Sequence, residues 1–289
     1  MSEEPFDLII QAEELFRHLH DPNYVIVDCR FNLSDPTWGE NDYSLHHIPG
    51  AVYADLNRDL SAPRTSRSGR HPLPSKEQME AVFSRMGIDA ARQVVVYDTT
   101  SGSIAGRFWF LLKYCGHEKV ALLDGGFVRW GSKGFPIETK VNKNPARKFI
   151  AELHPEMLVT TSQVEDLHRD PHWRLIDARA PERYAGSSEP IDPVAGHIPG
   201  AMNRFHENNL TGEGVYKSPA QLKQEYSPLL LTDAPENTIL YCGSGVTSVH
   251  DLIAMKLAGF PTPRLYIGSW SEWIRDPKHP VKTEKSGPS

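Results

Sequence analysis

One cysteine stands where its chemistry can be used. Cys242 follows the apolar run 238–241 and begins the turn Gly243-Ser244-Gly245, after which residues 249–257 place apolar side chains at helical spacing. The pattern predicts a buried strand, a glycine-rich turn and a helix, with the cysteine in the turn. Backbone N–H groups of such a turn and the helix dipole together stabilise an anion. We therefore expect a reactive thiolate with a pKa below the usual value of about 8.5.

The other two cysteines lack such a setting. A free cysteine commonly behaves as a small buried apolar residue, and this is our interpretation of Cys29 and Cys115. Three cysteines without a C-x-x-C spacing provide neither a disulfide framework nor a cysteine-based zinc site. No metal site is predicted.

The elements that would position Cys242 belong to a repeat. The pentapeptide HIPGA occurs at 47–51 and again at 197–201, and an apolar strand ending in aspartate occurs at 24–28 and at 174–177. The strand before Cys242 has its counterpart in residues 94–98, which end in Asp98 rather than cysteine. The chain is therefore a duplication in which only the second copy carries the thiol.

Each copy alternates short apolar strands with helical patterns, which predicts an α/β fold with a parallel sheet flanked by helices on both faces. We expect an inactive N-terminal domain over residues 1–140 and a catalytic C-terminal domain over residues 158–289. The polar, proline-containing segment 141–157 is predicted to link them.

Composition narrows the partners. The 289 residues are 39% hydrophobic and 24% charged, with a formal net charge of −6 and dispersed lysines and arginines. This charge favours neither nucleic acid nor anionic membranes. The first residues do not resemble a signal peptide, and no stretch approaches the ~20 apolar residues of a membrane span, so neither is expected. We expect a cytoplasmic, monomeric protein with no nucleic-acid or membrane partner.

Four motifs together carry a family resemblance: the doubled HIPGA, Asp177-Ala178-Arg179, the loop CGSGVT at 242–247 and GSWSEW at 268–273. The chain resembles the tandem, two-domain rhodanese-like sulfurtransferases, and is most similar to those using 3-mercaptopyruvate. The resemblance implies that Cys242 takes a sulfane sulfur from a small-molecule donor, becomes a persulfide, and passes the sulfur to a thiol, cyanide or protein-thiol acceptor. No cofactor is implied.

The same resemblance assigns further residues to the site. Arg179 and Arg183 would receive an anionic donor, although each could instead form a structural ion pair. The hydroxyl of Ser244 would form a hydrogen bond to the sulfur-donor substrate and would pair with His71. His71 could alternatively be a structural histidine. The family aspartate that orients this histidine is replaced by Asn57, which cannot stabilise a cationic imidazole. The donor would also contact the rest of the loop: Gly243, Gly245, Val246 and Thr247.

The residues that follow Cys242 indicate which sulfur donor is preferred and which other functions compete. Members preferring thiosulfate carry basic residues after the cysteine, whereas Gly243, Ser244 and Gly245 are uncharged, which favours 3-mercaptopyruvate with release of pyruvate. Thiosulfate sulfurtransferase activity is the second interpretation, and a persulfide carrier or regulatory module without turnover is the third. A phosphatase would need an arginine where Ser248 stands. We expect a pocket between the two copies, with His71 facing Ser244.

Overall fold

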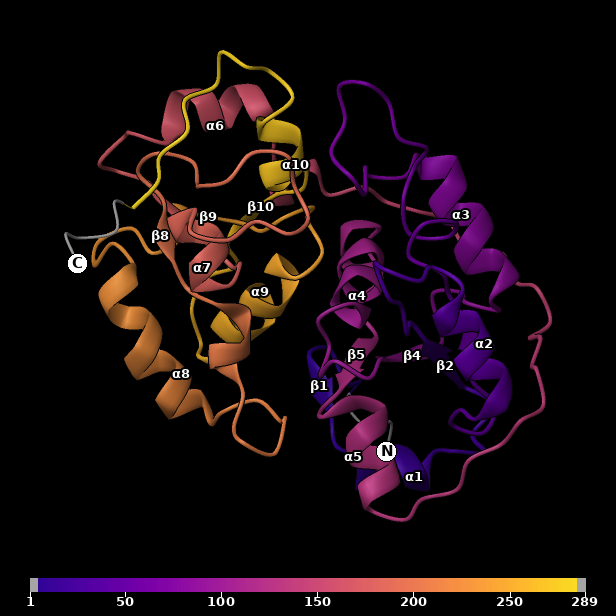
Figure 1. Cartoon of the computed structure of the whole chain (residues 1–289). Helices are drawn as coiled ribbons and strands as arrows, with labels where there is room; N and C mark the ends of the chain where they lie inside the picture. Colours follow the sequence, from indigo (N-terminus) through magenta and orange to yellow (C-terminus); the bar gives the residue numbers. More distant parts are fainter. Residues whose placement is uncertain (1–4, 285–289) are drawn as a thin grey trace. The chain divides into compact units, whose positions relative to one another are not determined.

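The computed structural model describes residues 5–284, and its chain forms two compact units (Figure 1). The first unit comprises residues 5–62, 74–154 and 212–216, and the second comprises residues 63–73, 155–211 and 217–284. The segment 63–73 lies within the first repeat of the sequence but belongs to the second unit. The residues on either side of His71 are therefore built into the same unit as Cys242.

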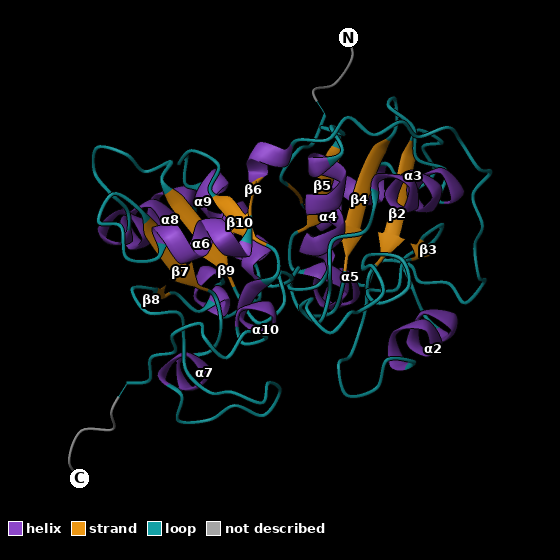
Figure 2. Cartoon of the chain, turned by 90° about the horizontal axis from the view of Figure 1, so that it is seen from above, coloured by secondary structure: helices purple, strands orange, loops and turns teal. Residues whose placement is uncertain are grey.

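The first unit is built on a parallel five-stranded sheet in the order β1-β5-β4-β2-β3. Figure 2 labels β5, β4, β2 and β3 of this sheet. Its strands are β1 (Ile9–Ile10), β2 (Tyr24–Asp28), β3 (Val52–Tyr53), β4 (Gln93–Tyr97) and β5 (Val120–Leu123). Its helices are α1 (Ala12–Arg17), α2 (Trp38–Leu45), α3 (Lys76–Arg85), α4 (Ala105–Tyr114) and α5 (Gly126–Ser132). Every residue of β4 is buried, as expected for a central strand covered on both faces.

The second unit repeats this topology, with the sheet order β6-β10-β9-β7-β8 and parallel pairing throughout. Its strands are β6 (Leu158–Val159), β7 (Arg174–Asp177), β8 (Met202–Asn203), β9 (Thr238–Tyr241) and β10 (Arg264–Tyr266). Its α-helices are α6 (Thr161–Leu167), α7 (Pro181–Ala185), α8 (Pro219–Tyr226), α9 (Ser248–Leu257) and α10 (Ser269–Trp273). Short 3₁₀ helices are η1 (Pro155–Met157), η2 (His206–Asn209) and η3 (Ser227–Leu229). The predicted tandem α/β fold is confirmed.

The packing of the second unit follows the alternation of side chains along its strands. On one face, Ile239 and Tyr241 of β9 form a buried cluster with Trp270 and Trp273 of α10 and with Val164 of α6. The helix α9 follows the central strand β9 directly after the loop that contains Cys242. All of its first eight residues, 248–255, are fully buried, which fixes the end of that loop in the core. Of the helices in residues 5–284, none is long and apolar enough to cross a membrane.

Several helices begin where short polar side chains satisfy their first N–H groups. Ser75, Thr160 and Ser218 each accept a hydrogen bond from the backbone of a glutamine three residues later, and that glutamine returns a bond to the capping residue. These reciprocal caps contribute about 1 kcal/mol each to the helix that they begin. They define where α3, α6 and α8 begin.

The histidines of the doubled HIPGA are structural. His197 stacks on Tyr184 with 3.8 Å between the ring centroids, and its Nδ1 lies 2.8 Å from the Tyr184 carbonyl oxygen. His47 repeats both contacts with Tyr43, at 4.0 Å and 2.6 Å. The recurrence of the motif therefore reports a shared turn rather than two sites.

Candidate active site

Cys242 lies directly after β9, and the loop that it begins ends where α9 starts at Ser248. Gly245 makes this turn possible because its φ is +70°, in the left-handed region that side chains disfavour. A Cβ at this position would stand 2.1 Å from the carbonyl oxygen of Ile267. The loop thus packs against the chain after β10 so closely that only glycine fits.

The start of α10 fixes the cysteine from its other side. The backbone N–H of Cys242 donates to Ser269 Oγ at 3.1 Å, and its carbonyl accepts from Trp270 N at 3.0 Å. Ser271 N donates to the carbonyl of Gly243 at 2.9 Å. Ser269 adopts a φ of +55°, a strained conformation that its hydrogen bonds to Cys242 and Tyr266 hold in place. The motif at 268–273 therefore anchors the loop, a role that its sequence did not specify.

The thiol of Cys242 is buried yet favours its anion. Burial alone raises the pKa of the thiol, but hydrogen bonds from the Thr247 hydroxyl and from the N–H groups of Ser244 and Ser248 outweigh it. The pKa therefore lies below its ordinary value, as the turn predicted. Only 1% of the residue is exposed, so these donors rather than water solvate the sulfur.

The equivalent turn of the first unit shows what the cradle binds. Asp98 Oδ1 accepts from the N–H groups of Thr100 and Gly102 at 2.7 and 2.9 Å, and Oδ2 accepts from Ile104 and Ala105 at 2.8 Å each. Four backbone donors thus converge on one side-chain anion. In this unit the cradle is filled by its own carboxylate, whereas in the second unit it surrounds a thiol.

His71 reaches the loop from the segment 63–73. Its Nδ1 lies 2.8 Å from Ser244 Oγ, so the expected pairing of these two side chains is present. The segment is held against α10, because Arg70 N donates to Ser271 Oγ at 3.0 Å and Gly69 N to Glu272 Oε2 at 3.4 Å. These contacts fix the backbone on which His71 stands.

Asn57 belongs to the first unit and is exposed. Its backbone N–H donates to Asp55 Oδ1 at 2.9 Å as part of a local turn. Asp59, two residues on, is buried and pairs with Arg85 at 2.6 Å. These contacts explain how the polar residues after the first HIPGA are held within the first unit.

The Nε/Nη2 edge of the Arg179 guanidinium is occupied by hydrogen bonds within the protein. Its Nε and Nη2 form a fork on the carboxylate of Asp177, at 3.1 and 2.6 Å, and Nη2 also donates to the carbonyl of Gly196 at 2.7 Å. Its remaining nitrogen, Nη1, reaches Glu189 at 3.3 Å. Arg30 forms the same fork on Asp28 in the first unit, which has no cysteine at the cradle. The buried Arg179 therefore holds the strand end and the following chain.

Two other guanidinium groups lie nearest to the loop. A Cβ on Gly243 would stand 2.6 Å from Nη2 of Arg70 and 3.5 Å from Nη1 and Nη2 of Arg183. Asp192 joins the pair, because its two oxygens accept from Arg70 Nη1 and from Arg183 Nη2. Glu189 accepts from Nε of Arg183 at 3.0 Å. The sequence indicated Arg183 but missed Arg70, whose only signal was its position next to His71.

The remaining loop residues support the turn. Val246 is buried. Thr247 is the last residue before α9 and directs its hydroxyl to the thiol. Of the predicted loop residues, Gly243 thus faces the arginines, Gly245 permits the turn, and Thr247 solvates the sulfur.

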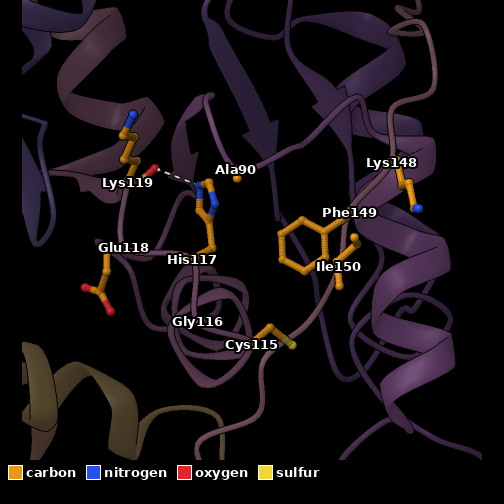
Figure 3. Close-up of a pocket in the computed structure, with 9 residues that line it drawn as sticks. All are labelled: Ala90, Cys115, Gly116, His117, Glu118, Lys119, Lys148, Phe149 and Ile150. Carbon is orange, nitrogen blue, oxygen red and sulfur yellow. Dashed lines mark hydrogen bonds between the residues drawn. The ribbon is translucent and has the colours of Figure 1, made fainter.

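The other cysteines are not activated. Burial, and then the neighbouring Asp28 carboxylate, raise the pKa of the Cys29 thiol, and burial followed by Glu80 raises that of Cys115 to about 12. Cys115 lines a separate cavity of about 280 Å³ in the first unit, beside Phe149 and His117 (Figure 3). Its sulfur contacts Met79 Sδ at 3.6 Å. Both residues fit the predicted structural role.

Comparison with known proteins agrees with this architecture. The model of the rhodanese-like domain matches residues 11–133 and again residues 160–276. A protein of Pseudomonas aeruginosa described as a "Probable 3-mercaptopyruvate sulfurtransferase" is 43% identical over 277 residues, covering 95% of this chain and 98% of its own. The thiosulfate sulfurtransferase of Rattus norvegicus is 32% identical over 275 residues, covering 92% and 91%.

Solved structures give the same result. The 3-mercaptopyruvate sulfotransferase structure from Escherichia coli superposes with a TM-score of 0.79 at 29% identity, covering 91% of this chain and 99% of that one. The 3-mercaptopyruvate sulfurtransferase from Leishmania major superposes with a TM-score of 0.82 at 26% identity, covering 94% and 75%. The rhodanese-like domain matches twice, and the relatives match along nearly the whole chain. The chain therefore belongs to the family of two-domain rhodanese-like sulfurtransferases.

Proposed function

We propose that this sulfurtransferase takes sulfur from 3-mercaptopyruvate, carries it as a persulfide on Cys242, and releases pyruvate before passing the sulfur to a thiol or to cyanide. The observation that carries the proposal is a buried thiol with a lowered pKa whose loop also presents Ser244, paired with His71 at 2.8 Å. A 2-oxo acid needs a donor for its carbonyl oxygen, and a thiosulfate ion does not.

In the first half-reaction the Cys242 thiolate attacks the donor sulfur. A sulfur–sulfur bond forms, the carbon–sulfur bond of the donor breaks, and its electron pair passes to the three-carbon fragment as the enolate of pyruvate. The proton of the donor thiol moves to the enolate carbon, which gives pyruvate and leaves the persulfide as an anion. The backbone and hydroxyl donors that stabilise the thiolate then stabilise this persulfide.

Ser244 acts on the charge that develops in this step. When its hydroxyl accepts from Nδ1–H of His71, its own proton is directed to the carbonyl oxygen of the donor, where the enolate charge accumulates. A neutral imidazole with its proton on Nδ1 suffices for this role. The replacement of the family aspartate by Asn57 is therefore compatible with turnover.

Arg183 and Arg179 have different roles in this proposal. Arg183 stands beside Gly243 and receives the donor, in keeping with its expected role. Arg179 acts through another residue, because its Nη1 reaches Glu189, which in turn holds Nε of Arg183. We assign it as a positioning residue. Catalysis resides in the 158–289 half together with the segment 63–73, and residues 1–140 otherwise contribute an inactive copy.

In the second half-reaction an acceptor thiolate attacks the outer sulfur of the persulfide. A new sulfur–sulfur bond forms on the acceptor, the bond to Cys242 breaks, and the thiolate is regenerated in its cradle. No redox cofactor is consumed, because the outer sulfur keeps its oxidation level when it moves from the Cys242 sulfur to the acceptor sulfur. The relatives support a small-molecule donor and a thiol acceptor of this kind.

Thiosulfate sulfurtransferase activity is the second candidate. The loop itself is uncharged, but the guanidinium groups of Arg70 and Arg183 lie next to Gly243 and would attract a dianion. Several relatives are also named as thiosulfate sulfurtransferases. We expect 3-mercaptopyruvate to exceed thiosulfate in kcat/KM by at least about tenfold, or ~1.4 kcal/mol.

The test measures pyruvate release and the site of the sulfur together. Protein treated with 3-mercaptopyruvate should release pyruvate in many turnovers with a thiol acceptor, and mass spectrometry should find one added sulfur on the Cys242 peptide. Cys242→Ser should abolish both results, whereas Cys115→Ser should change neither. Labelling of another cysteine, or a preference for thiosulfate, would contradict the assignment. One labelled equivalent without turnover would instead indicate a carrier.

A further inference from the structure

Arg70 presents a guanidinium edge that the protein does not use. Its Nη1 is paired with Asp192, while its Nε is buried and has no hydrogen-bond partner among residues 5–284, and no bond from its Nη2 is found in that range. A buried donor without a partner normally costs about 1–3 kcal/mol of stability. Such a group in a well-packed site is therefore a marker of a ligand that completes its bonding.

The unused edge has a defined preference. Nε and Nη2 form the side-on fork of arginine, and twice in this chain the same fork binds a carboxylate: Arg30 holds Asp28 and Arg179 holds Asp177. In each of those pairs both nitrogens lie about 2.6–3.1 Å from the carboxylate oxygens. The matching partner of the Arg70 fork is thus a planar carboxylate that accepts two parallel bonds.

The fork lies beside Gly243, the residue that follows Cys242. Its Nη2 stands 2.6 Å from the position that a Cβ on Gly243 would occupy. Nη1 of Arg183, for which the described residues provide no hydrogen bond, is 3.5 Å from the same point. In a three-carbon thiol acid the sulfur and the carboxylate carbon are separated by only three bonds, so a donor whose sulfur meets Cys242 carries its carboxylate close to the neighbouring residue.

Two carboxylates, those of Asp192 and Glu189, pair with the two guanidinium groups, but neither bonds to the Nε/Nη2 edge of Arg70. Asp192 accepts from one nitrogen of each guanidinium, and Glu189 accepts from Nε of Arg183. Asp192 therefore holds the two arginines together and leaves one edge of each facing Gly243. An incoming carboxylate replaces no existing hydrogen bond.

We propose that Arg70 is a donor-binding residue, and that its Nε/Nη2 fork, together with Nη1 of Arg183, receives the carboxylate of the sulfur donor. This inference rests on the proposed function for the identity of the donor, but it assigns the donor's anionic end to a residue brought by the segment 63–73. The positive charge that the loop around Cys242 lacks is thereby supplied from a distant part of the sequence, on the same segment as His71.

The closing experiment compares two alkylating agents, because it does not require sulfur transfer. Iodoacetate carries a carboxylate next to the carbon that the thiolate attacks, while iodoacetamide has the same shape without the charge. In the wild-type protein the ratio of their rates at Cys242 should exceed that of a free thiol. Arg70→Gln should lower the ratio by about tenfold or more, since a hydrogen-bonded charged pair is lost. Arg67→Gln, an exposed arginine of the same segment, should leave it unchanged.

Arg70→Lys separates the fork from its charge. Lysine keeps a positive charge near Asp192 but cannot form two parallel bonds, so it should lose most of the same selectivity. With 3-mercaptopyruvate, both Arg70 variants should raise KM by about tenfold or more while kcat changes less. Equal ratios in wild type and Arg70→Gln, with iodoacetamide reacting normally in both, would overturn the inference. Failure of wild type to release pyruvate would instead refute the proposed function and leave the alkylation ratio as evidence for an anion receiver.

Discussion

The two glycines of the loop around Cys242 provide a paired test, because the same substitution should fail in different ways. Gly243→Ala and Gly245→Ala each add one methyl group two residues apart. At Gly245 the new Cβ would stand 2.1 Å from a backbone oxygen, Ile267 O, in a residue with φ of +70°. At Gly243, which is not among the residues of positive φ, it would stand 2.6 Å from the end of the Arg70 side chain.

The magnitudes follow from what must move. The left-handed conformation alone costs a non-glycine residue about 1–2 kcal/mol, and the backbone of Ile267 must also shift, so Gly245→Ala should destabilise the protein by at least ~2 kcal/mol. The same shift would open the cradle and slow alkylation of Cys242. At Gly243 the guanidinium of Arg70 can swing aside, so the unfolding free energy should stay within about 0.5 kcal/mol of wild type. The displaced arginine should lower kcat/KM for 3-mercaptopyruvate by about tenfold.

Thermal or urea unfolding, iodoacetamide alkylation and pyruvate release measured on both variants distinguish these outcomes. Combining Gly243→Ala with Arg70→Gln should give little more loss than either change alone, because both remove the same contact. If the two changes are additive, or if Gly243→Ala loses stability like Gly245→Ala, then the loop is not arranged around Arg70 as described and the reasoning fails.

Three further perturbations test the electrostatics. Thr247→Val removes a hydroxyl donor to the thiolate, so the pKa of Cys242 should rise and the acidic limb of the kcat/KM profile should move to higher pH; an unmoved limb would show that the hydroxyl contributes nothing. Arg179→Lys should lower the unfolding free energy by about 2 kcal/mol or more, since the buried carboxylate of Asp177 loses its fork, and a stability equal to wild type in urea would contradict that role. Burial raises the pKa of Asp251 to about 7 from 3.8, so the folded state binds the extra proton and stability should decline as pH rises between about 4 and 7; Asp251→Asn should flatten this decline in pH-dependent melting curves.

The fold was predictable because its signals are local and repeated. Apolar runs such as 94–98 are too short for helices, and the strand-helix alternation occurs twice, so the tandem parallel sheets followed directly. The short helices α2 and α7 did not have enough turns to show a period. The assignment of residues 63–73 to the second unit has no sequence signature, because it depends on contacts between residues some 200 positions apart.

The site was predictable to the extent that a backbone pattern encodes it. The turn after Cys242 and the pairing of Ser244 with His71 came from motifs, and both are present. Arg179 illustrates the limit: its type and position suggested a substrate contact, yet a buried carboxylate two residues earlier in the chain occupies its fork. Which face of an arginine remains available is a property of packing, and the same reason concealed Arg70.

The two copies separate the architecture of an anion cradle from its chemistry. Both units have the buried Asp–Arg fork at a strand end, and both converge backbone donors on the side chain that follows the central strand. In the first unit that side chain is Asp98, whose carboxylate satisfies all four donors and is a poor nucleophile toward sulfur. The first unit includes the segment 212–216, with neither histidine nor arginine, whereas the second includes 63–73, with both. The proposed mechanism requires two independent features, a thiol in the cradle and a segment that brings Arg70 and His71 to it, and of the two units only the second has both.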